Sequence, residues 1–181
     1  MTVLDRHRFE RMYAAHFDTV LRYCLRRSNR ENALDAAVET FTVAWRRRRD
    51  LPWEQPLPWL YGVAHKVLGN QWRSSLRQRR AIARLQGTGG DDDPGPEVQV
   101  VRAAEDQEVL DALADLRPDD RELIRLAAWE ELGREEMAAL LGCSANAVTK
   151  RLNRALDRLG AQLGQRRQAG SRFFRRERTP A

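Results

Sequence analysis

The stretch QGTGGDDDPGPE, at residues 86–97, divides the chain into two parts that must fold separately. It holds no large apolar side chain, so it cannot contribute to a hydrophobic core. The 181 residues of the chain suffice for one domain or two small ones. We therefore expect an N-terminal domain at residues 1–85, a flexible acidic linker at 86–102 and a C-terminal domain at 103–163. A basic tail at 164–181 has no clear period, and we assign it no role.

Apolar residues recur at helical spacing on both sides of this linker. The first predicted helix has one stripe made of Phe9, Met12, Tyr13, His16, Phe17, Val20, Leu21, Cys24 and Leu25. The second has a face made of Ala33, Ala36, Ala37, Thr40, Phe41, Ala44 and Trp45. Because His16 and Cys24 lie on the first stripe, we expect both in the core. The second helix is predicted to end in the arginine run at 46–49, where cations suit the negative end of the helix dipole.

The remaining elements are also predicted to be helices. Three prolines make residues 50–59 a loop, and Pro58 suits the first turn of a third helix that ends near Arg80. Its inward positions are Leu60, Val63, Ala64, Val67, Leu68 and Leu76. Beyond the linker, helices are expected from near Ala103, from Pro118, over 134–141 and over 145–159. No segment alternates like a strand, so the predicted fold class is all-α.

The charges are distributed in three blocks. Residues 1–85 hold 17 Lys and Arg against 8 Asp and Glu, a net charge of +9. Residues 86–132 hold 4 against 14, a net charge of −10, and residues 133–181 hold 11 against 4, a net charge of +7. Two basic blocks indicate two surfaces that bind a polyanion, separated by a segment that avoids it. Charge on solvated helix faces is the alternative, and so large an asymmetry argues against it.

The sequence contains no pattern for bond chemistry or for metal binding. Cys24 and Cys143 lack CxxC spacing and the three histidines lack metal-ligand spacing, so we expect no metal site, no cofactor and no catalytic residue. There is no apolar run long enough to cross a bilayer and no signal-peptide pattern. These features predict a cytoplasmic protein without membrane insertion.

The stretch ALLGCSANAVTKRLNRAL, at residues 139–156, has two short helical patterns interrupted by Gly-Cys-Ser. Gly142 can take the backbone angle that a tight turn needs, and Ser144 can cap the following helix. The apolar positions expected to hold the two helices together are Met137, Ala138, Leu141, Val148, Leu152 and Ala155. This pattern predicts a helix-turn-helix, with an ordinary helical hairpin as the alternative.

The outer face of the second helix of this motif separates those alternatives. It carries hydrogen-bonding and cationic side chains, namely Asn146, Thr149, Lys150, Asn153 and Arg154. Such groups reach base edges and phosphates from the major groove. We therefore predict that this helix binds duplex DNA, as a monomer on an asymmetric site, because no helix remains to form a dimer.

Both halves of the chain resemble one known family. The segment DALADLRPDDRELIRLAAWEELGREEMAALLGCSANAVTKRLNRALDRL resembles the C-terminal promoter-binding domain of bacterial sigma factors of the extracytoplasmic-function (ECF) group. Three earlier segments resemble the N-terminal domain of the same family, in order and spacing: FERMYAAHFDTVLRYCLRR, ALDAAVETFTVAW and PWLYGVAHKVLGNQWR. The two matches together cover roughly residues 9–160.

This resemblance implies an activity and a set of partners. Such proteins bind core RNA polymerase, recognise a promoter and help to open the duplex, and they perform no bond chemistry. The implied partners are core RNA polymerase, promoter DNA as duplex and as melted strand, and an anti-sigma factor. The acidic linker is similar to those that run through the polymerase near the path of nascent RNA.

The resemblance also implies roles for surface residues of the N-terminal domain. The surface that docks on the polymerase clamp corresponds to Asp35, Val38, Glu39 and Thr42, where Val38 replaces a polar residue usual in the family. The face that meets the minus-ten promoter element corresponds to His65, Lys66, Asn70, Arg73 and Arg77. Lys66 and Asn70 replace an Asn and an acid common there, so the family's base preference does not carry over.

The resemblance also implies that two tryptophans take part in separating the DNA strands. Trp53 and Trp59 lie where the family captures an unstacked base, which would gain stacking on an aromatic ring. For Trp59 and Trp72, the sequence is equally compatible with a core position.

Two other binding functions compete with the sigma-factor interpretation. One is a two-domain helix-turn-helix transcription regulator that acts without being a polymerase subunit and senses a ligand or a partner with its first domain. The basic stripe of the first domain argues against the apolar pocket that a ligand would need. The other is a general single-strand binder, which would not require a tight helix-turn-helix. An enzyme is the interpretation that the sequence supports least.

Overall fold

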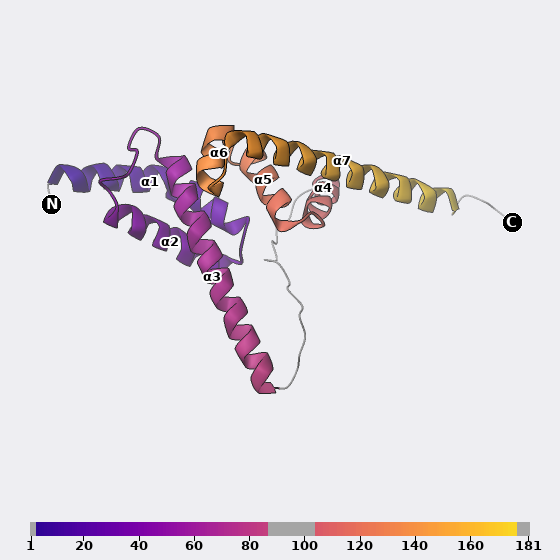
Figure 1. The fold of residues 1–181 in the computed structure, drawn as a ribbon, viewed down its shortest axis with the longest axis horizontal. Coiled ribbons are helices and arrows are strands. Elements are labelled where there is room, and N and C mark those ends of the chain that lie inside the picture. Colours follow the sequence, from indigo (N-terminus) through magenta and orange to yellow (C-terminus); the bar gives the residue numbers. More distant parts are fainter. Residues whose placement is uncertain (1–2, 87–103, 177–181) are drawn as a thin grey trace. The chain divides into compact units, whose positions relative to one another are not determined.

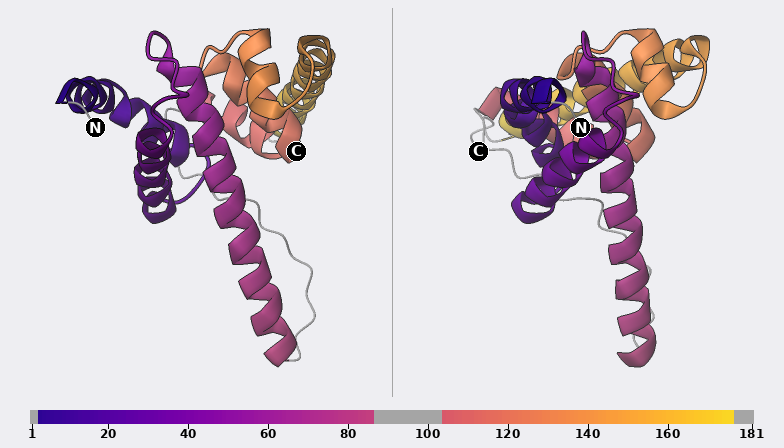
Figure 2. Two further views of the ribbon diagram at one scale, coloured as in Figure 1. Left: turned by 60° about the vertical axis from the view of Figure 1, so that its left-hand side comes forward. Right: turned by 90° about the vertical axis from the view of Figure 1, so that its left-hand side faces the viewer.

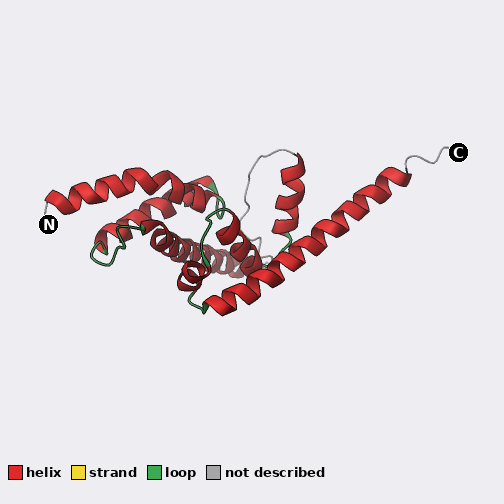
Figure 3. Ribbon diagram, turned by 90° about the horizontal axis from the view of Figure 1, so that it is seen from above, coloured by secondary structure: helices red, strands yellow, loops and turns green. Residues whose placement is uncertain are grey.

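The computed structural model describes residues 3–86 and 104–176, and every regular element in these two ranges is an α-helix (Figures 1 and 3). The predicted all-α fold class is confirmed. The chain divides into two compact units, Met1–Val100 and Val101–Ala181. Apart from Gln86, the expected linker at 86–102 lies outside the described residues.

The first unit contains three helices, α1 (Val3–Leu25), α2 (Arg30–Arg46) and α3 (Pro56–Gln86), each packed against the other two. Asn29 caps the N-terminus of α2, because its side chain accepts a hydrogen bond of 2.9 Å from the Asn32 backbone N–H. Pro58 lies in the first turn of α3, as predicted.

Small side chains let these helices approach closely. The buried face of α2 is made of Ala33, Ala36, Ala37, Thr40, Phe41 and Ala44, six of the seven positions predicted from spacing; the seventh, Trp45, is only half-buried. Cys24 of α1 is fully buried, as expected, whereas His16 is only half-buried. Tyr13 and Leu25, predicted to face inward, are 39% and 36% exposed. Both predictions of burial were therefore wrong.

A stacked pair of tyrosines completes the core of the first unit. Tyr23 of α1 is fully buried, and its ring centroid lies 4.8 Å from that of Tyr61 on α3. The predicted stripe did not include Tyr23. The Arg27 guanidinium lies 3.6 Å from the centroid of the Tyr23 ring and donates a hydrogen bond to the Tyr23 carbonyl. The tyrosine therefore packs against a ring on α3 and against a cation in the turn that follows α1.

Helix α3 continues past the point where it packs on α1 and α2 (Figure 2). Leu60, Ala64 and Val67 are buried, but the positions that follow on the same side are polar: Gln71, Ser74, Ser75 and Gln78. The helix was predicted to end near Arg80 and instead reaches Gln86. Its last turns therefore extend beyond the core to which its first half contributes.

The second unit contains α4 (Ala104–Ala114), α5 (Pro118–Ala128), α6 (Arg134–Leu141) and α7 (Ala145–Arg176). Helix α7 packs against the other three (Figure 1). The buried side chains include Leu113, Leu123, Leu126, Met137, Val148 and Leu152. The sequence predicted that the last helix would end at Leu159 and that the residues after Gly164 had no period. The helix instead continues to Arg176, so that prediction was wrong.

Arg121 joins the end of α4 to α5. Its guanidinium donates hydrogen bonds to the carbonyl oxygens of Leu113, Ala114 and Leu116, at and directly after the end of α4, where carbonyl groups lack their usual helical donors. Burial lowers the pKa of Arg121, although the nearby Asp115 carboxylate opposes this. Arg121 thus stabilises the connection between α4 and α5.

Candidate nucleic-acid interface

The tight turn of the second unit has the geometry expected of a helix-turn-helix. Gly142 ends α6 with φ 66° and ψ 38°, a left-handed conformation that suits glycine. The Cys143 backbone N–H donates to the Ala138 carbonyl at 3.0 Å. Ser144 then caps α7, because its hydroxyl accepts a 3.2 Å hydrogen bond from the Ala147 backbone N–H. The predicted turn and cap are both confirmed.

Apolar residues on the inner faces hold α6 against α7. Five of the six predicted positions are buried: Met137, Ala138, Val148, Leu152 and Ala155. The sixth, Leu141, is only half-buried, and Leu140 is buried in its place. Gly142, directly after Leu141, has a left-handed backbone and ends the helix there. The buried position therefore differs by one residue from the position that helical spacing predicted.

The outer face of α7 displays the predicted DNA-reading residues together. Asn146, Lys150, Asn153 and Arg154 are exposed. Thr149 is half-buried, and its hydroxyl donates to the Ala145 carbonyl at 3.0 Å, which leaves only its acceptor capacity for a ligand. At 100° per residue, the four exposed side chains lie within one face of the first three turns.

Two further residues bound this face, and the sequence prediction did not include them. Arg151 is exposed on the flank of α7 and adds a cation. Asp157 is exposed on the same face as Lys150, two turns later, where its carboxylate would repel a phosphate. The sign change at Asp157 restricts the candidate contact to the first three turns of α7.

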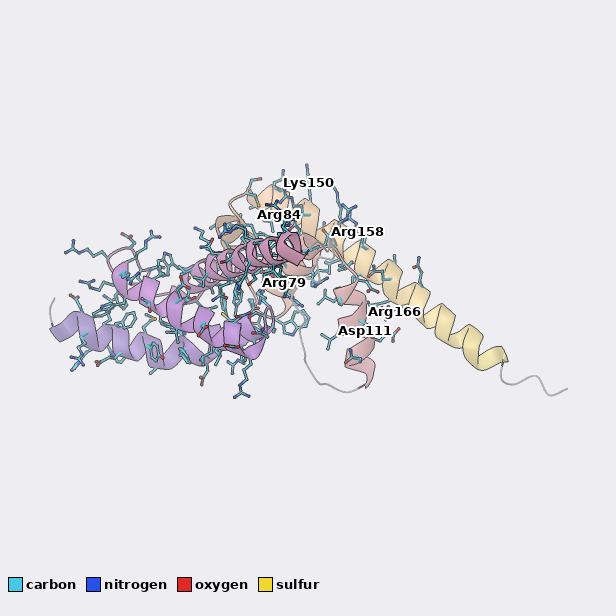
Figure 4. The ribbon with its side chains drawn as sticks, turned by 90° about the horizontal axis from the view of Figure 1, so that it is seen from below. Arg79, Arg84, Asp111, Lys150, Arg158 and Arg166 are labelled. Carbon is cyan, nitrogen blue, oxygen red and sulfur yellow. The ribbon has the colours of Figure 1, made fainter. Side chains whose placement is uncertain are left out.

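Ion pairs fix the rest of α7 to α4 and α5 (Figure 4). The Arg158 guanidinium donates to the carboxylate of Asp120, a buried residue at the start of α5. Arg166 pairs with Asp111 of α4 at 3.6 Å and with Asp115, directly after the end of α4, at 2.6 Å; Figure 4 labels Arg166 and Asp111. The hydrogen bond to Asp115 raises the pKa of Arg166. These contacts set the axis of the helix that carries the candidate DNA face.

In the first unit, the outer face of α2 brings together the four residues predicted to dock on the polymerase. Asp35, Val38, Glu39 and Thr42 are all exposed, and the Thr42 hydroxyl donates to the Val38 carbonyl at 2.9 Å. Val38 is 50% exposed and Leu34, one turn earlier, is 47% exposed. Leu34 was not in the predicted set. An exposed apolar pair flanked by carboxylates is typical of a surface that contacts another protein.

The loop between α2 and α3 places Trp53 beside two arginines of α1. The Arg8 guanidinium lies 4.6 Å from the Trp53 ring centroid. A cleft of about 250 Å³ at this point is lined by Arg8, Arg11, Met12, His16, Trp53 and Pro56. An aromatic ring beside cations is suited to a nucleotide, whose base can stack while its phosphate is neutralised.

The other tryptophans are distinguished by their exposure. Trp72 is 45% exposed, so it is not a core residue. Trp59 is half-buried, and the Arg47 guanidinium lies 5.8 Å from its ring centroid. Both rings therefore keep accessible surface on the first unit.

The polar stripe predicted on α3 is only partly continuous. Lys66, Asn70, Arg73 and Arg77 are exposed, and Arg73 donates to the Asn70 side-chain oxygen at 2.6 Å. His65 is half-buried and lies about 100° around the helix from Lys66, so it flanks the stripe. The Arg73 contact holds the Asn70 amide in one orientation.

Neither a metal centre nor a membrane span is found in the described ranges. Within residues 3–86 and 104–176, no group of His, Cys, Asp and Glu side chains is arranged to hold a metal ion. No helix of the described part is both long enough and apolar enough to cross a bilayer.

Comparison with known proteins assigns the second unit to a family. Residues 106–159 match the family described as Sigma-70, region 4. This range runs from α4 through the helix-turn-helix and ends where the extension of α7 begins.

Relatives of known name match over both units. The chain is 33% identical over 168 residues to the RNA polymerase sigma factor CarQ of Myxococcus xanthus, covering 87% of this chain and 90% of CarQ. It is 33% identical over 141 residues to the RNA polymerase sigma factor CnrH of Cupriavidus metallidurans, covering 71% of this chain and 72% of CnrH. A probable RNA polymerase sigma factor of Xanthomonas campestris, RfaY, is 34% identical over 139 residues, but the chain spans only 34% of that protein.

A solved structure supports the same assignment. CnrH in complex with the cytosolic domain of CnrY superimposes with a TM-score of 0.58 at 28% identity, covering 87% of this chain and 88% of the CnrH chain. The chain therefore belongs to the RNA polymerase sigma factors, in the ECF group that its motifs resemble, a family that is not a class of enzymes.

Proposed function

We propose that this chain binds core RNA polymerase, directs it to specific promoters and assists the opening of the duplex at the start of transcription. The observation that carries the proposal is the helix-turn-helix of α6 and α7, which lies within a region 4 match and displays amide and cationic groups on one exposed face. The chain acts in the cytoplasm, without a cofactor and without bond chemistry of its own. The chain binds its promoter as one copy, on an asymmetric site.

Core polymerase docks on the outer face of α2. The exposed pair Leu34 and Val38 supplies apolar area, and Asp35 and Glu39 supply charges that select an oppositely charged partner. Reversing both charges (Asp35→Arg, Glu39→Arg) should weaken assembly with core by at least tenfold, on the order of the cost of like charges at an interface. A reversal at Asp18, which is exposed on α1 and lies outside this face, is the control.

The promoter is read at two places. The first three turns of α7 enter the major groove of the minus thirty-five element, with Asn146, Thr149, Lys150, Asn153 and Arg154 as the contact set. The minus-ten element meets α3 through Lys66, Asn70, Arg73 and Arg77, with His65 at its flank. A base of the melted strand stacks near Trp53 and Trp59, where arginines already lie over the rings.

A regulatory protein partner belongs to the same proposal. CnrH has been solved with the cytosolic domain of CnrY bound. We infer that an anti-sigma factor binds this chain and competes with core polymerase for the exposed face of α2. Adding core should then displace such a partner, and a stable ternary complex would contradict the competition.

The experiment that tests the proposal is assembly with core polymerase, measured by fluorescence anisotropy of the labelled chain. We expect saturable binding by the wild-type chain and the Asp18→Arg control, and weaker binding by Asp35→Arg/Glu39→Arg. Equal binding by all three proteins, with helical content unchanged by circular dichroism, would remove α2 from the interface. No binding by the wild-type chain would favour a helix-turn-helix regulator that acts without being a polymerase subunit.

A further inference from the structure

The stripe of α3 that is proposed to meet the minus-ten element contains one side chain that can accept a hydrogen bond. The stripe is made of Lys66, Asn70, Arg73 and Arg77, which are all exposed and lie within a sector of about 60° at 100° per residue. Lysine and arginine side chains only donate hydrogen bonds, whereas an asparagine amide both donates and accepts. The Asn70 oxygen is therefore the single acceptor among these four side chains.

The Arg73 guanidinium occupies this acceptor. It donates a hydrogen bond of 2.6 Å to the Asn70 side-chain oxygen, and such charge-assisted bonds are short and strong. Because a guanidinium has no acceptor, the amide atom that faces it must be the oxygen. The contact thus fixes the orientation of the amide and leaves the Asn70 NH2 group directed away from Arg73.

The local geometry of α3 supports this pairing. A Cβ built at Gly69 would lie 3.9 Å from Nη1 and 4.0 Å from Nη2 of Arg73, so the guanidinium lies over the glycine that precedes Asn70. Residues three apart on a helix are neighbours on its surface. Long helical side chains also point back toward the N-terminus of their helix. Arg73 therefore reaches Asn70 in the direction that helical side chains ordinarily take.

The four bases differ in the groups that they present to such a stripe in the major groove. Guanine presents the acceptors N7 and O6, and thymine presents the acceptor O4. Adenine and cytosine each present an amino group, which needs an acceptor. An asparagine reads adenine by donating to N7 and accepting from the N6 amino group. When Arg73 holds the Asn70 oxygen, that amino group would have to approach a positive charge.

We propose that the Arg73–Asn70 pair makes α3 select a base with a keto group, guanine or thymine, at the paired position of the minus-ten element that Asn70 faces. Asn70 donates to the base, and Arg73 is a positioning residue because it acts through Asn70. This inference rests on the proposed function, in which the stripe meets that element. It adds the chemical class of base that the stripe selects.

Selection from a randomised element tests the preference. The probe is a promoter fragment from which wild-type holoenzyme starts a run-off transcript, with its minus-ten element randomised, and the fragments that reconstituted holoenzyme binds are sequenced. The position that Asn70 reads is the one at which Asn70→Ala relaxes the preference. An abasic site placed there on each strand in turn identifies the strand, because wild type and Asn70→Ala should bind alike only when the base that Asn70 reads is missing.

On that strand, wild-type holoenzyme should enrich guanine or thymine at least about fivefold over adenine and cytosine, the lower end of what a base-reading side chain supplies. Enrichment of adenine or cytosine would overturn the inference.

Two variants change the hydrogen-bonding groups of the pair. Asn70→Asp replaces the NH2 group by an oxygen, so it should move the preference to adenine or cytosine on the same strand. Arg73→Met frees the Asn70 oxygen, so adenine should gain at least about fivefold relative to guanine. A merely structural role of Arg73 would not change which base is selected. A wild-type preference in either variant, with helical content unchanged by circular dichroism, would contradict the assigned pairing.

Arg77→Met is the matched control. Arg77 is exposed on the same stripe, one turn after Arg73, and its replacement removes the same charge without freeing the Asn70 oxygen. This variant should bind all sequences more weakly and keep the wild-type base preference. A gain of adenine in Arg77→Met equal to that in Arg73→Met would reveal a general effect of charge and remove the positioning role.

The outcomes for the proposed function are separate. A wild-type chain that starts no transcript with core polymerase would overturn the proposed function and this inference with it. Normal wild-type initiation, with Asn70→Ala keeping the wild-type preference at every position of the minus-ten element, would show that Asn70 reads no base. That result would overturn the inference alone.

Discussion

The Arg158 guanidinium of α7 donates a hydrogen bond to the Asp120 carboxylate at the start of α5. The two ends of this pair differ in their surroundings, since the Asp120 side chain is 11% exposed and that of Arg158 is 48% exposed. The arginine could be solvated without its partner, whereas the carboxylate could not. The pair therefore ties the helix that carries the DNA face to the body of the second unit.

The first prediction follows from that asymmetry. Arg158→Met should lower the free energy of unfolding by ~1–3 kcal/mol, because Asp120 would stay buried without its charged donor. The double variant Asp120→Leu/Arg158→Met should recover part of this loss, since no buried charge is left without a partner. Urea unfolding of the full chain measures these two variants and Asp120→Leu alone, with the exposed Arg154→Met as the control. A double variant as unstable as the sum of the single changes would contradict the coupling.

The second prediction uses one substitution at two glycines. Gly142→Ala should destabilise the chain by about 1–2 kcal/mol, because alanine resists the left-handed conformation. Gly160→Ala, in the middle of α7, should stabilise it by about 0.5–1 kcal/mol, because alanine favours the helix. A Cβ added at either glycine would meet nothing within 4 Å, so steric clashes do not contribute to the difference between the two variants. If the Tm shifted in the same direction for both variants, the left-handed conformation assigned to Gly142 would be contradicted.

Local spacing and turn chemistry were enough to predict much of this molecule. The turn at Gly142 and the cap at Ser144 follow from the needs of a few neighbouring residues, and the structure has both. The apolar face of α2 follows from helical period alone. The residues expected on the outer face of α7 lie together for the same reason, because period fixes which side chains share a face.

Contacts between distant residues explain what could not be predicted. Gly160 and Gly164 weaken the helical pattern after Leu159, and the extension of α7 includes an ion pair of Arg166 with Asp115, 51 residues earlier. Tyr23 is buried because it stacks on Tyr61 of another helix.

The third prediction concerns pH. Burial lowers the pKa of His16 below its usual value of 6.5, so the unfolded chain binds a proton at a pH where the folded chain does not. Its contribution to stability is complete above about pH 6.5 and is lost progressively as the pH falls below that value. His16→Gln should make the free energy of unfolding less dependent on pH between about 7.5 and 5.5. His7→Gln, whose side chain is 72% exposed, is the control, and equal profiles for wild type and His16→Gln would contradict the assignment.

The fourth prediction concerns how α7 reads DNA. Replacing a base-reading side chain such as Asn153 by Ala should cost ~1–3 kcal/mol and relax preference at one position of the minus thirty-five element. Replacing a phosphate-binding cation should instead weaken all sequences alike and reduce the salt slope by about one. Holoenzyme binding to a library with a randomised upstream element assigns Lys150 and Arg154 to one behaviour or the other. Gln165→Ala, exposed about three turns beyond Arg154, should bind like wild type. If the variants at Lys150, Asn153 and Arg154 all bound DNA with the affinity and preference of Gln165→Ala, the helix-turn-helix would have only a structural role.

The central claim is that this chain gives core RNA polymerase its promoter specificity, and run-off transcription tests it most directly. Core polymerase, genomic DNA fragments and the purified chain are combined, and the 5′ ends of the transcripts are sequenced. We expect discrete start sites that appear only with the chain and share an upstream element, and that weaken together in Asn153→Ala. Transcripts with the same scattered ends in the presence and absence of the chain would contradict the claim.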